Sequence, residues 1–192
     1  MQPILLASSS RYRRELLARL RLPFEHQSPD IDERPAPKED ARTLAARLAT
    51  QKAKALQASF STHLIIGSDQ VACVGNTILN KPLSHERAVE QLMHSSGRTV
   101  TFHTGLALLN ATTTRLQLEV VTYTVHFRDL TPESIERYLR IEQPYDCAGS
   151  FKVEGLGISL FAKMEGDDPT SLIGLPLISL ANMLRSEGIE LP

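Results

Sequence analysis

Residues 64–71 read Leu64-Ile65-Ile66-Gly67-Ser68-Asp69-Gln70-Val71, a compact apolar run that ends in small residues and a carboxylate. Such a run is typical of a buried strand that delivers an acid to the edge of a sheet, where ligands settle in open α/β folds. Gly67 would let the backbone approach another element closely. Lys81 follows about one hairpin later, so an acid and a base could share one opening. The alternative is a buried strand followed by an ordinary polar turn.

The composition limits the classes of partner. The chain has 192 residues and a formal net charge of -1, enough for a substantial core but with no global attraction to nucleic acid or anionic membranes. No apolar run approaches the ~20 residues of a membrane span, and the N-terminus does not resemble a signal peptide. Cys73 and Cys147 are too few for a disulfide framework. We therefore expect a cytoplasmic protein without nucleic-acid or membrane partners.

Helical and strand patterns alternate along the chain, which favours an α/β fold with a mixed twisted sheet. We interpret residues 1–192 as a single domain folded as two lobes. The β-rich pair of long strands is a candidate interface for a homodimer. The patterns predict strands at residues 3–7, 99–110, 116–128 and 158–161, and helices at residues 11–20, 40–58, 84–95, 131–143 and 176–187.

A candidate anion site lies at the first strand–turn–helix junction. Residues 8–10 are three serines, and the helix that follows begins with Arg11, Arg13 and Arg14. Backbone N–H groups and the helix dipole favour phosphate at such an N-terminus, and arginine adds forked donors. Ser8 and the arginines of this helix together form a candidate phosphate-binding site. The alternative is a capped surface helix with a solvated basic face.

Two further charged features have both a functional and an ordinary interpretation. The carboxylates of residues 30–33, Glu33 among them, either are solvated or supply an oxygen ligand to Mg²⁺. Lys52 shares a helical stripe with Leu44 and Leu48, which places it on the inward face of its helix. There it either snorkels past the core or reaches phosphate in a cleft.

Several segments together resemble the Maf family in order and approximate spacing. The resemblance covers nearly the whole chain and implies a cytoplasmic nucleoside triphosphate pyrophosphatase. It also implies the inosine-triphosphatase-like (Maf) α/β fold, with two lobes around a nucleotide-binding cleft. The matching segments are residues 6–17, 31–33, 51–53, 67–71, 80–82, 145–157 and 172–176.

The resemblance also implies roles for individual residues. Arg13 matches the second arginine of the family's Ser-x-Ser-Pro-Arg-Arg motif, and Glu33, Lys52, Asp69 and Lys81 match its conserved polar residues. Arg13, Lys52 and Lys81 would hold the triphosphate, and Glu33, Lys52, Asp69 and Lys81 would be catalytic. A divalent cation, Mg²⁺ or Mn²⁺, would bind Glu33 and Asp69. Asp69 matches the family's proton acceptor, but an ordinary aspartate (pKa ~3.9) is a weak base at neutral pH. Whether Asp69 binds metal, orients water or does both is left open by the sequence.

Three departures from the commonest family pattern resemble the branch that hydrolyses 7-methyl-GTP rather than dTTP and UTP. Tyr12 stands where most members have arginine, Gln70 where many have threonine, and Glu154 where many have glutamine. Guanine methylated at N7 is positively charged, and a cation over an aromatic face such as that of Tyr12 gains ~0.5–2 kcal/mol. Glu154 adds negative charge, and Gln70 offers a donor and an acceptor to a base edge. The alternative is neutral drift at tolerant positions.

The expected reaction is attack of water on the α-phosphorus of 7-methyl-GTP, which gives 7-methyl-GMP and pyrophosphate. One alternative is a pyrophosphatase for other common or modified nucleotides, in a house-cleaning role. Another is a non-catalytic nucleotide-binding regulator linked to cell division. A DNA-binding module is disfavoured because the chain has no net basic charge.

Overall fold

The computed structural model describes residues 2–192, which fold into two compact units. Unit 1 contains the residues up to 70 together with 103–121 and 168–192, and unit 2 contains 71–102 and 122–167. Within the described residues, seven strands form one sheet in the order β2-β1-β3-β5-β6-β7, with β4 paired to β3. Parallel and antiparallel pairs both occur, so the predicted α/β fold with a mixed sheet is confirmed.

The sheet of unit 1 is built around a short buried strand, β1 (Ile4–Leu6). It pairs in parallel with β2 (Glu25–His26) on one side and with β3 (Leu64–Val74) on the other. The long strands β5 (Thr99–Asn110) and β6 (Leu116–Phe127) follow β3 in the sheet. Apolar side chains on both faces of β1 and β3 explain their burial, since each face is covered by helices.

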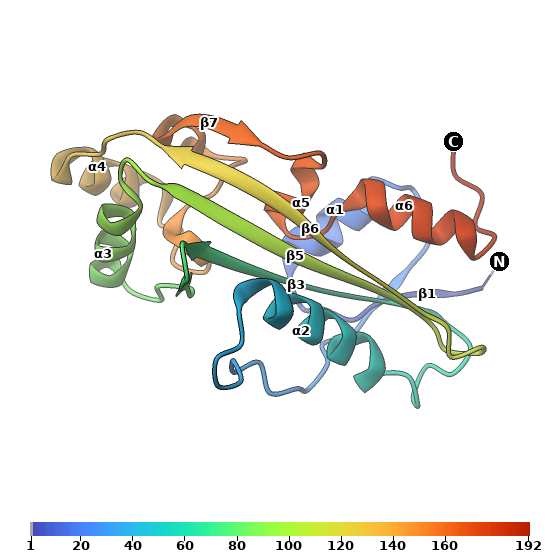
Figure 1. The fold of residues 1–192 in the computed structure, drawn as a ribbon. Coiled ribbons are helices and arrows are strands. Elements are labelled where there is room, and N and C mark those ends of the chain that lie inside the picture. Colours follow the sequence, from blue (N-terminus) through green and yellow to red (C-terminus); the bar gives the residue numbers. More distant parts are fainter. Residues whose placement is uncertain (1) are drawn as a thin grey trace. The chain divides into compact units, whose positions relative to one another are not determined.

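Helices cover both faces of the unit 1 sheet (Figure 1). The helix α2 (Ala41–Ala55) packs on one face through Ala49 and Ala53, against Leu5 and Ile65. The helices α1 (Arg11–Ala18) and α6 (Leu177–Ser186) pack on the other face. The small residues of α2 let it lie close to the sheet. Gly67 is needed there, because a Cβ at this position would collide with the backbone oxygen of Ala49.

A buried aspartate organises the segment before α6. Asp168 accepts hydrogen bonds from the backbone N–H groups of Thr170 (2.9 Å) and Ile178 (2.8 Å). It thereby caps the short helix α5 (Pro169–Ile173) and also holds the first turn of α6.

Unit 2 combines the far ends of β3, β5 and β6 with β4 (Thr77–Leu79), β7 (Phe161–Glu165), α3 (His85–Ser95) and α4 (Pro132–Glu142). Two short 3-10 helices, η1 (Ala148–Ser150) and η2 (Leu156–Leu160), lie against α3 and α4 respectively. Its core contains an edge-to-face aromatic cluster with ring centroids 4.8–5.6 Å apart. The cluster consists of Phe102, Phe127, Phe151 and Phe161.

Two local predictions were wrong. Residues 158–160 belong to η2 and not to a strand, and β7 begins only at Phe161. The chain turns back on itself at Gly157, where a Cβ would collide with the carbonyl oxygen of Lys152. Asp69 does not end its strand, because β3 continues to Val74 and pairs with β4. Between residues 2 and 192, we find no helix with the length and apolar character required to cross a membrane.

Candidate active site

Three charged side chains of unit 1 meet at one point. The Nζ atom of Lys52 lies 2.6 Å from Oδ1 of Asp69 and 2.7 Å from Oε1 of Glu33. Lys52 comes from α2, Asp69 from β3, and Glu33 from the loop between β2 and α2. The side chains of Lys52 and Asp69 are only 8% and 12% exposed, whereas that of Glu33 is 59% exposed. One cation is therefore held between a buried carboxylate and a carboxylate that opens to solvent.

The packing of α2 on β3 explains why Lys52 reaches Asp69. Lys52 follows Leu44 and Leu48 on the buried stripe of α2, so its side chain points to the sheet. Gly67, two residues before Asp69, allows the backbones of α2 and β3 to approach closely. The prediction that Lys52 lies on the inward face of its helix is confirmed.

Arg13 and Ser8 form a second polar group in the same unit. Arg13 donates through Nε to the carbonyl oxygen of Gly174 (2.8 Å) and through Nη1 to Oγ of Ser8 (3.4 Å). Burial lowers the pKa of Arg13, while the carboxylates of Asp69 and Glu33 act to raise it. An arginine keeps its charge under such conditions. Its positive charge therefore lies within electrostatic reach of both carboxylates of the Glu33–Lys52–Asp69 cluster.

Serine side chains cap the first turn of α1 and use two of its backbone N–H groups. Ser10 caps the helix by accepting from the backbone N–H of Arg13 (3.4 Å), and Oγ of Ser8 accepts from the backbone N–H of Ser10 (3.1 Å). The Ser8 oxygen accepts in both of these bonds with Ser10 and Arg13, so its hydroxyl hydrogen can donate to a ligand. Whether phosphate binds here stays a prediction.

Tyr12 already has a cation over its ring. The guanidinium carbon of Arg11 lies 5.5 Å from the centroid of Tyr12, and Arg11 also forms an exposed ion pair with Glu15 (3.2 Å). One face of Tyr12 is therefore covered by the guanidinium of its chain neighbour, Arg11. A methylated guanine would use the same kind of interaction.

Gln70 is tied into the protein through its amide nitrogen. Nε2 donates to the carbonyl oxygens of Ser171 (2.7 Å) and Leu172 (3.0 Å) and approaches Oγ1 of Thr104 (3.2 Å). The sequence suggested that Gln70 offers a donor and an acceptor, but these contacts leave only its acceptor oxygen for a ligand. The sequence did not identify Thr104 or Ser171, because no local pattern links residues so far apart in the chain.

Lys81 and Glu154, the two remaining predicted residues, belong to unit 2 and not to the cluster of unit 1. Both are exposed. The segment of Lys81 is held on each side, because the Asn80 carbonyl accepts from Nε2 of Gln91 (2.8 Å) and the N–H of Leu83 donates to the carbonyl of Tyr145 (3.1 Å). Glu154 precedes the turn at Gly157.

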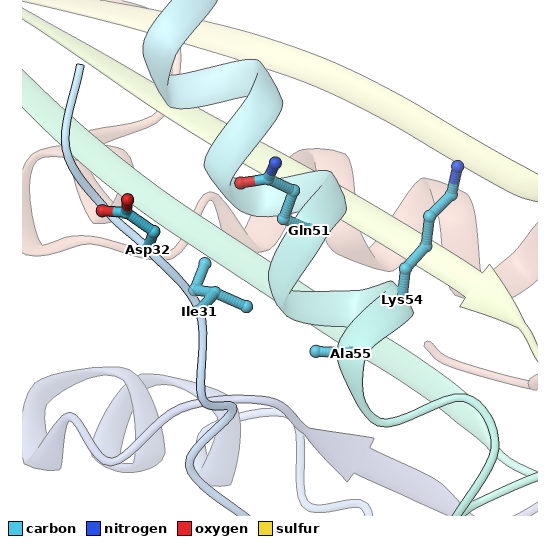
Figure 2. A pocket seen from close by; sticks show the side chains of 5 residues that line it. All are labelled: Ile31, Asp32, Gln51, Lys54 and Ala55. Carbon is cyan, nitrogen blue, oxygen red and sulfur yellow. The ribbon is translucent and has the colours of Figure 1, made fainter. Parts of the chain in front are cut away.

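A cavity of about 430 Å³ lies between the loop at Ile31 and Asp32 and the helix α2 (Figure 2). None of the predicted site residues lines it, although Asp32 and Gln51 directly precede Glu33 and Lys52 in the chain. Asp32 is paired with Arg34 at 2.6 Å, and this hydrogen bonding lowers the pKa of Asp32 to about 2. The lining consists of Ile31, Asp32, Gln51, Lys54 and Ala55.

The donor set of the cluster suits one kind of metal site. Among residues 2–192, no group of three or more histidine, cysteine, aspartate or glutamate side chains is placed to hold a metal ion. Glu33 and Asp69 nevertheless converge on one point, since both contact the same Nζ atom. Mg²⁺ is commonly bound by one or two carboxylates together with water and substrate phosphates. Glu33 and Asp69 therefore offer two ligands of the kind that Mg²⁺ uses, but the point on which they converge is occupied by the Lys52 amine.

The chain belongs to the Maf-like protein family, whose model matches residues 3–187. A 7-methyl-GTP pyrophosphatase of Pseudomonas fluorescens (strain Pf0-1) is 62% identical over 192 residues, which cover all of both chains. Proteins of the same name from Pseudomonas aeruginosa (strain PAO1) and Methylobacillus flagellatus are 57% and 56% identical. They cover 100% and 99% of each chain, respectively. The resemblance seen in the sequence is thus confirmed at the level of the family.

Proposed function

We propose that this chain is a nucleoside triphosphate pyrophosphatase that hydrolyses 7-methyl-GTP to 7-methyl-GMP and pyrophosphate. The observation that carries the proposal is the buried Lys52 amine held between Asp69 and Glu33, in a chain more than half identical to relatives of that name. Cations and carboxylates that meet beside a helix N-terminus are the groups that phosphoryl chemistry requires.

The charges of unit 1 are arranged to receive a triphosphate. Arg13 uses Nε and one Nη1 hydrogen within the protein, so its Nη2 donors are left for phosphate oxygens. Ser8 contributes its hydroxyl hydrogen beside them. Lys52 supplies a positive charge with little exposure to water, which strengthens its interaction with a bound anion. Lys81 of unit 2 is proposed as a further phosphate-binding residue on the family motif alone.

Two carboxylates carry one more charge than the Lys52 amine between them can neutralise, so they would repel a polyanion unless a further cation is bound. Glu33 and Asp69 are the residues that would hold that cation, Mg²⁺ or Mn²⁺. When bound, it would neutralise phosphate charge and polarise the phosphoryl oxygens. Glu33, the exposed member of the cluster, is the carboxylate that a hydrated cation would meet first.

The proposed chemistry breaks the bond between the α-phosphorus and the bridging oxygen to the β-phosphorus. A water oxygen forms the new bond to the α-phosphorus, and pyrophosphate leaves. Asp69 directs Oδ1 to Lys52, so Oδ2 is the oxygen that would accept a hydrogen bond from the attacking water and orient it. Arg13 and Lys52 stabilise the charge that develops on the transferred phosphoryl group.

The specificity for a methylated guanine rests on charge. Tyr12 would place its aromatic ring against the positively charged base, once the Arg11 guanidinium that covers one face of the ring has moved away. Gln70 has its acceptor oxygen left for the N–H groups of a guanine edge. Glu154 adds a negative charge where many relatives in the family have a neutral amide. The negative charge of Glu154 and the ring of Tyr12 favour a positively charged base over thymine or uracil, whereas the Gln70 oxygen requires only an N–H donor.

The catalytic part of the proposal is tested by Asp69→Asn. We expect turnover of 7-methyl-GTP to fall by about 10²–10⁴-fold, the usual contribution of a group that handles a proton in the transition state. The far-ultraviolet circular dichroism spectrum should be unchanged. Asp32→Asn is the matched control, because Asp32 lies in the same loop as Glu33 but is not part of the cluster, and its turnover should match the wild type. Full activity of Asp69→Asn would remove Asp69 from the chemistry.

The specificity part is tested by the triple change Tyr12→Arg, Gln70→Thr and Glu154→Gln. We expect the preference for 7-methyl-GTP over dTTP and UTP, expressed as a ratio of kcat/KM values, to fall or reverse. An unchanged ratio would favour a pyrophosphatase of broader nucleotide range and would refute the charge argument.

A further inference from the structure

The loop of residues 27–40 carries Glu33 but contains no helix or strand. Glu33 is also the most exposed member of its cluster. A loop has few backbone hydrogen bonds of its own, so its position depends on side chains from the elements around it. The contacts that hold this loop therefore decide whether Glu33 stays beside Lys52.

Arg47 supplies such contacts from α2, just over one turn before Lys52. Its Nε and Nη2 atoms donate to Oε1 (2.7 Å) and Oε2 (2.8 Å) of Glu39, which lies near the end of the loop. Nη2 donates also to the carbonyl oxygen of Arg34 (3.0 Å), the residue after Glu33. A two-bond arginine–carboxylate pair of this kind fixes orientation as well as distance.

Glu39, which is bonded to Arg47, also forms a hydrogen bond with a third residue of the loop. Its Oε2 atom accepts from the backbone N–H of Ala36 (2.9 Å). The Glu39 side chain is 6% exposed and that of Arg47 is 28% exposed, unlike the exposed pairs that contribute little to stability. The pair raises the pKa of Arg47 and lowers that of Glu39. Both groups are thus charged over the whole physiological range.

The Arg47 guanidinium also forms a hydrogen bond within α2, beside Lys52. Its Nη1 atom donates to Oε1 of Gln51 (3.0 Å), the residue before Lys52. Gln51 lies on α2 opposite the loop, where both line the cavity of Figure 2. Arg47 therefore bonds to the immediate chain neighbour of Glu33 and to the immediate chain neighbour of Lys52.

We propose that Arg47 and Glu39 are positioning residues that hold Glu33 against Lys52 and Asp69. They do not touch the reacting atoms and act through Glu33. The kinetic consequence rests on the proposed pyrophosphatase function, whereas the structural consequence, a fixed loop, does not.

The experiment compares Arg47→Met and Glu39→Gln with two references. Arg47→Lys keeps the positive charge but cannot form both bonds to Glu39. Its effects should therefore be smaller than those of Arg47→Met but should not vanish. Arg34→Met is the matched control, because it removes the exposed Arg34–Asp32 pair of the same loop and leaves the Arg34 carbonyl in place. Each protein is measured for kcat on 7-methyl-GTP, for the Mg²⁺ concentration that gives half-maximal activity, and for amide hydrogen exchange over residues 27–40.

We expect Arg47→Met to lower kcat by about 10-fold to 100-fold, the range for a catalytic group displaced by about 1 Å. In a Glu33→Gln background, the same change should lower kcat by less than about twofold, because residues that act as a unit are not additive. A full additional loss in that background would show that Arg47 does not act through Glu33 and would overturn the proposal.

Hydrogen exchange tests the positioning role with a measurement that does not depend on enzymatic activity. Exchange over residues 27–40 should quicken in Arg47→Met and Glu39→Gln but not in Arg34→Met. Equal exchange in all of these proteins would overturn the proposal even if kcat falls. Absence of pyrophosphatase activity in the wild type would instead refute the proposed function, while the exchange result would still decide whether the loop is held as we infer. If Arg47→Met fails to fold, Glu39→Gln tests the same contact from the other side.

Discussion

Replacing Lys52 by methionine should show how much its ion pairs contribute to the free energy of unfolding. Methionine keeps the length of the side chain but removes the amine that contacts Asp69 at 2.6 Å and Glu33 at 2.7 Å. Asp69, with a side chain only 12% exposed, then has no cationic hydrogen-bond partner on α2. It also faces a second carboxylate that the amine had screened.

The size of the effect follows from the burial of the two partners. Removing one member of a buried ion pair typically costs about 3–5 kcal/mol, because it leaves a buried charge unpaired. The contact with Glu33 adds little, since an exposed carboxylate regains its hydration. We therefore expect Lys52→Met to lower the free energy of unfolding by about 3 kcal/mol or more. In a chain of this size that loss lowers Tm by about 6–12 °C.

Urea unfolding followed by circular dichroism provides the assay, with two comparisons. Lys52→Met/Asp69→Asn removes both charges and should regain most of the lost stability, because an apolar replacement of a whole buried pair is often neutral. Lys54→Met, an exposed lysine of the same helix, should change stability by less than about 0.5 kcal/mol. If the double variant is as unstable as Lys52→Met, the loss comes from packing and the electrostatic reasoning is refuted.

Three further outcomes are expected. Gly67→Ala should destabilise by at least about 1–3 kcal/mol in urea unfolding and lower kcat, because its Cβ collides with the backbone of α2; wild-type stability would contradict the close approach. Arg13→Lys keeps the charge but loses the forked donors, so KM for 7-methyl-GTP should rise by about 10-fold to 100-fold at little cost in melting temperature; an unchanged KM would exclude a phosphate contact. Glu33→Gln should raise the Mg²⁺ concentration for half-maximal activity by at least roughly tenfold, and an unchanged requirement would exclude Glu33 as a ligand.

The sequence predicts the parts of the site that depend on local periodicity. The apolar run before Gly67 identifies β3, and the spacing of Leu44, Leu48 and Lys52 places the lysine on the buried face of α2. The need for glycine at position 67 is also visible, since the residue interrupts an otherwise bulky strand. These features depend on the direction in which side chains point within one helix or strand. The residues of that helix or strand alone determine this direction.

Other parts depend on contacts between distant segments and leave no local pattern. The ion pair of Arg47 with Glu39 spans a loop and a helix, and the amide of Gln70 bonds to Ser171 over a hundred residues away. The length of β3 beyond Asp69 depends on pairing with β4. Tertiary structure sets each of these features, so no helix or strand periodicity reports them.

The central claim is tested most directly by pyrophosphate release from the purified protein with Mg²⁺. The substrates are 7-methyl-GTP, GTP, dTTP, UTP and CTP at equal concentrations, with Asp69→Asn as the inactive reference. We predict the highest kcat/KM for 7-methyl-GTP, with 7-methyl-GMP as the second product. A preference for dTTP or UTP would contradict the specificity assigned to Tyr12, Gln70 and Glu154. Release from none of them, with the triphosphate still bound, would contradict the enzymatic function itself.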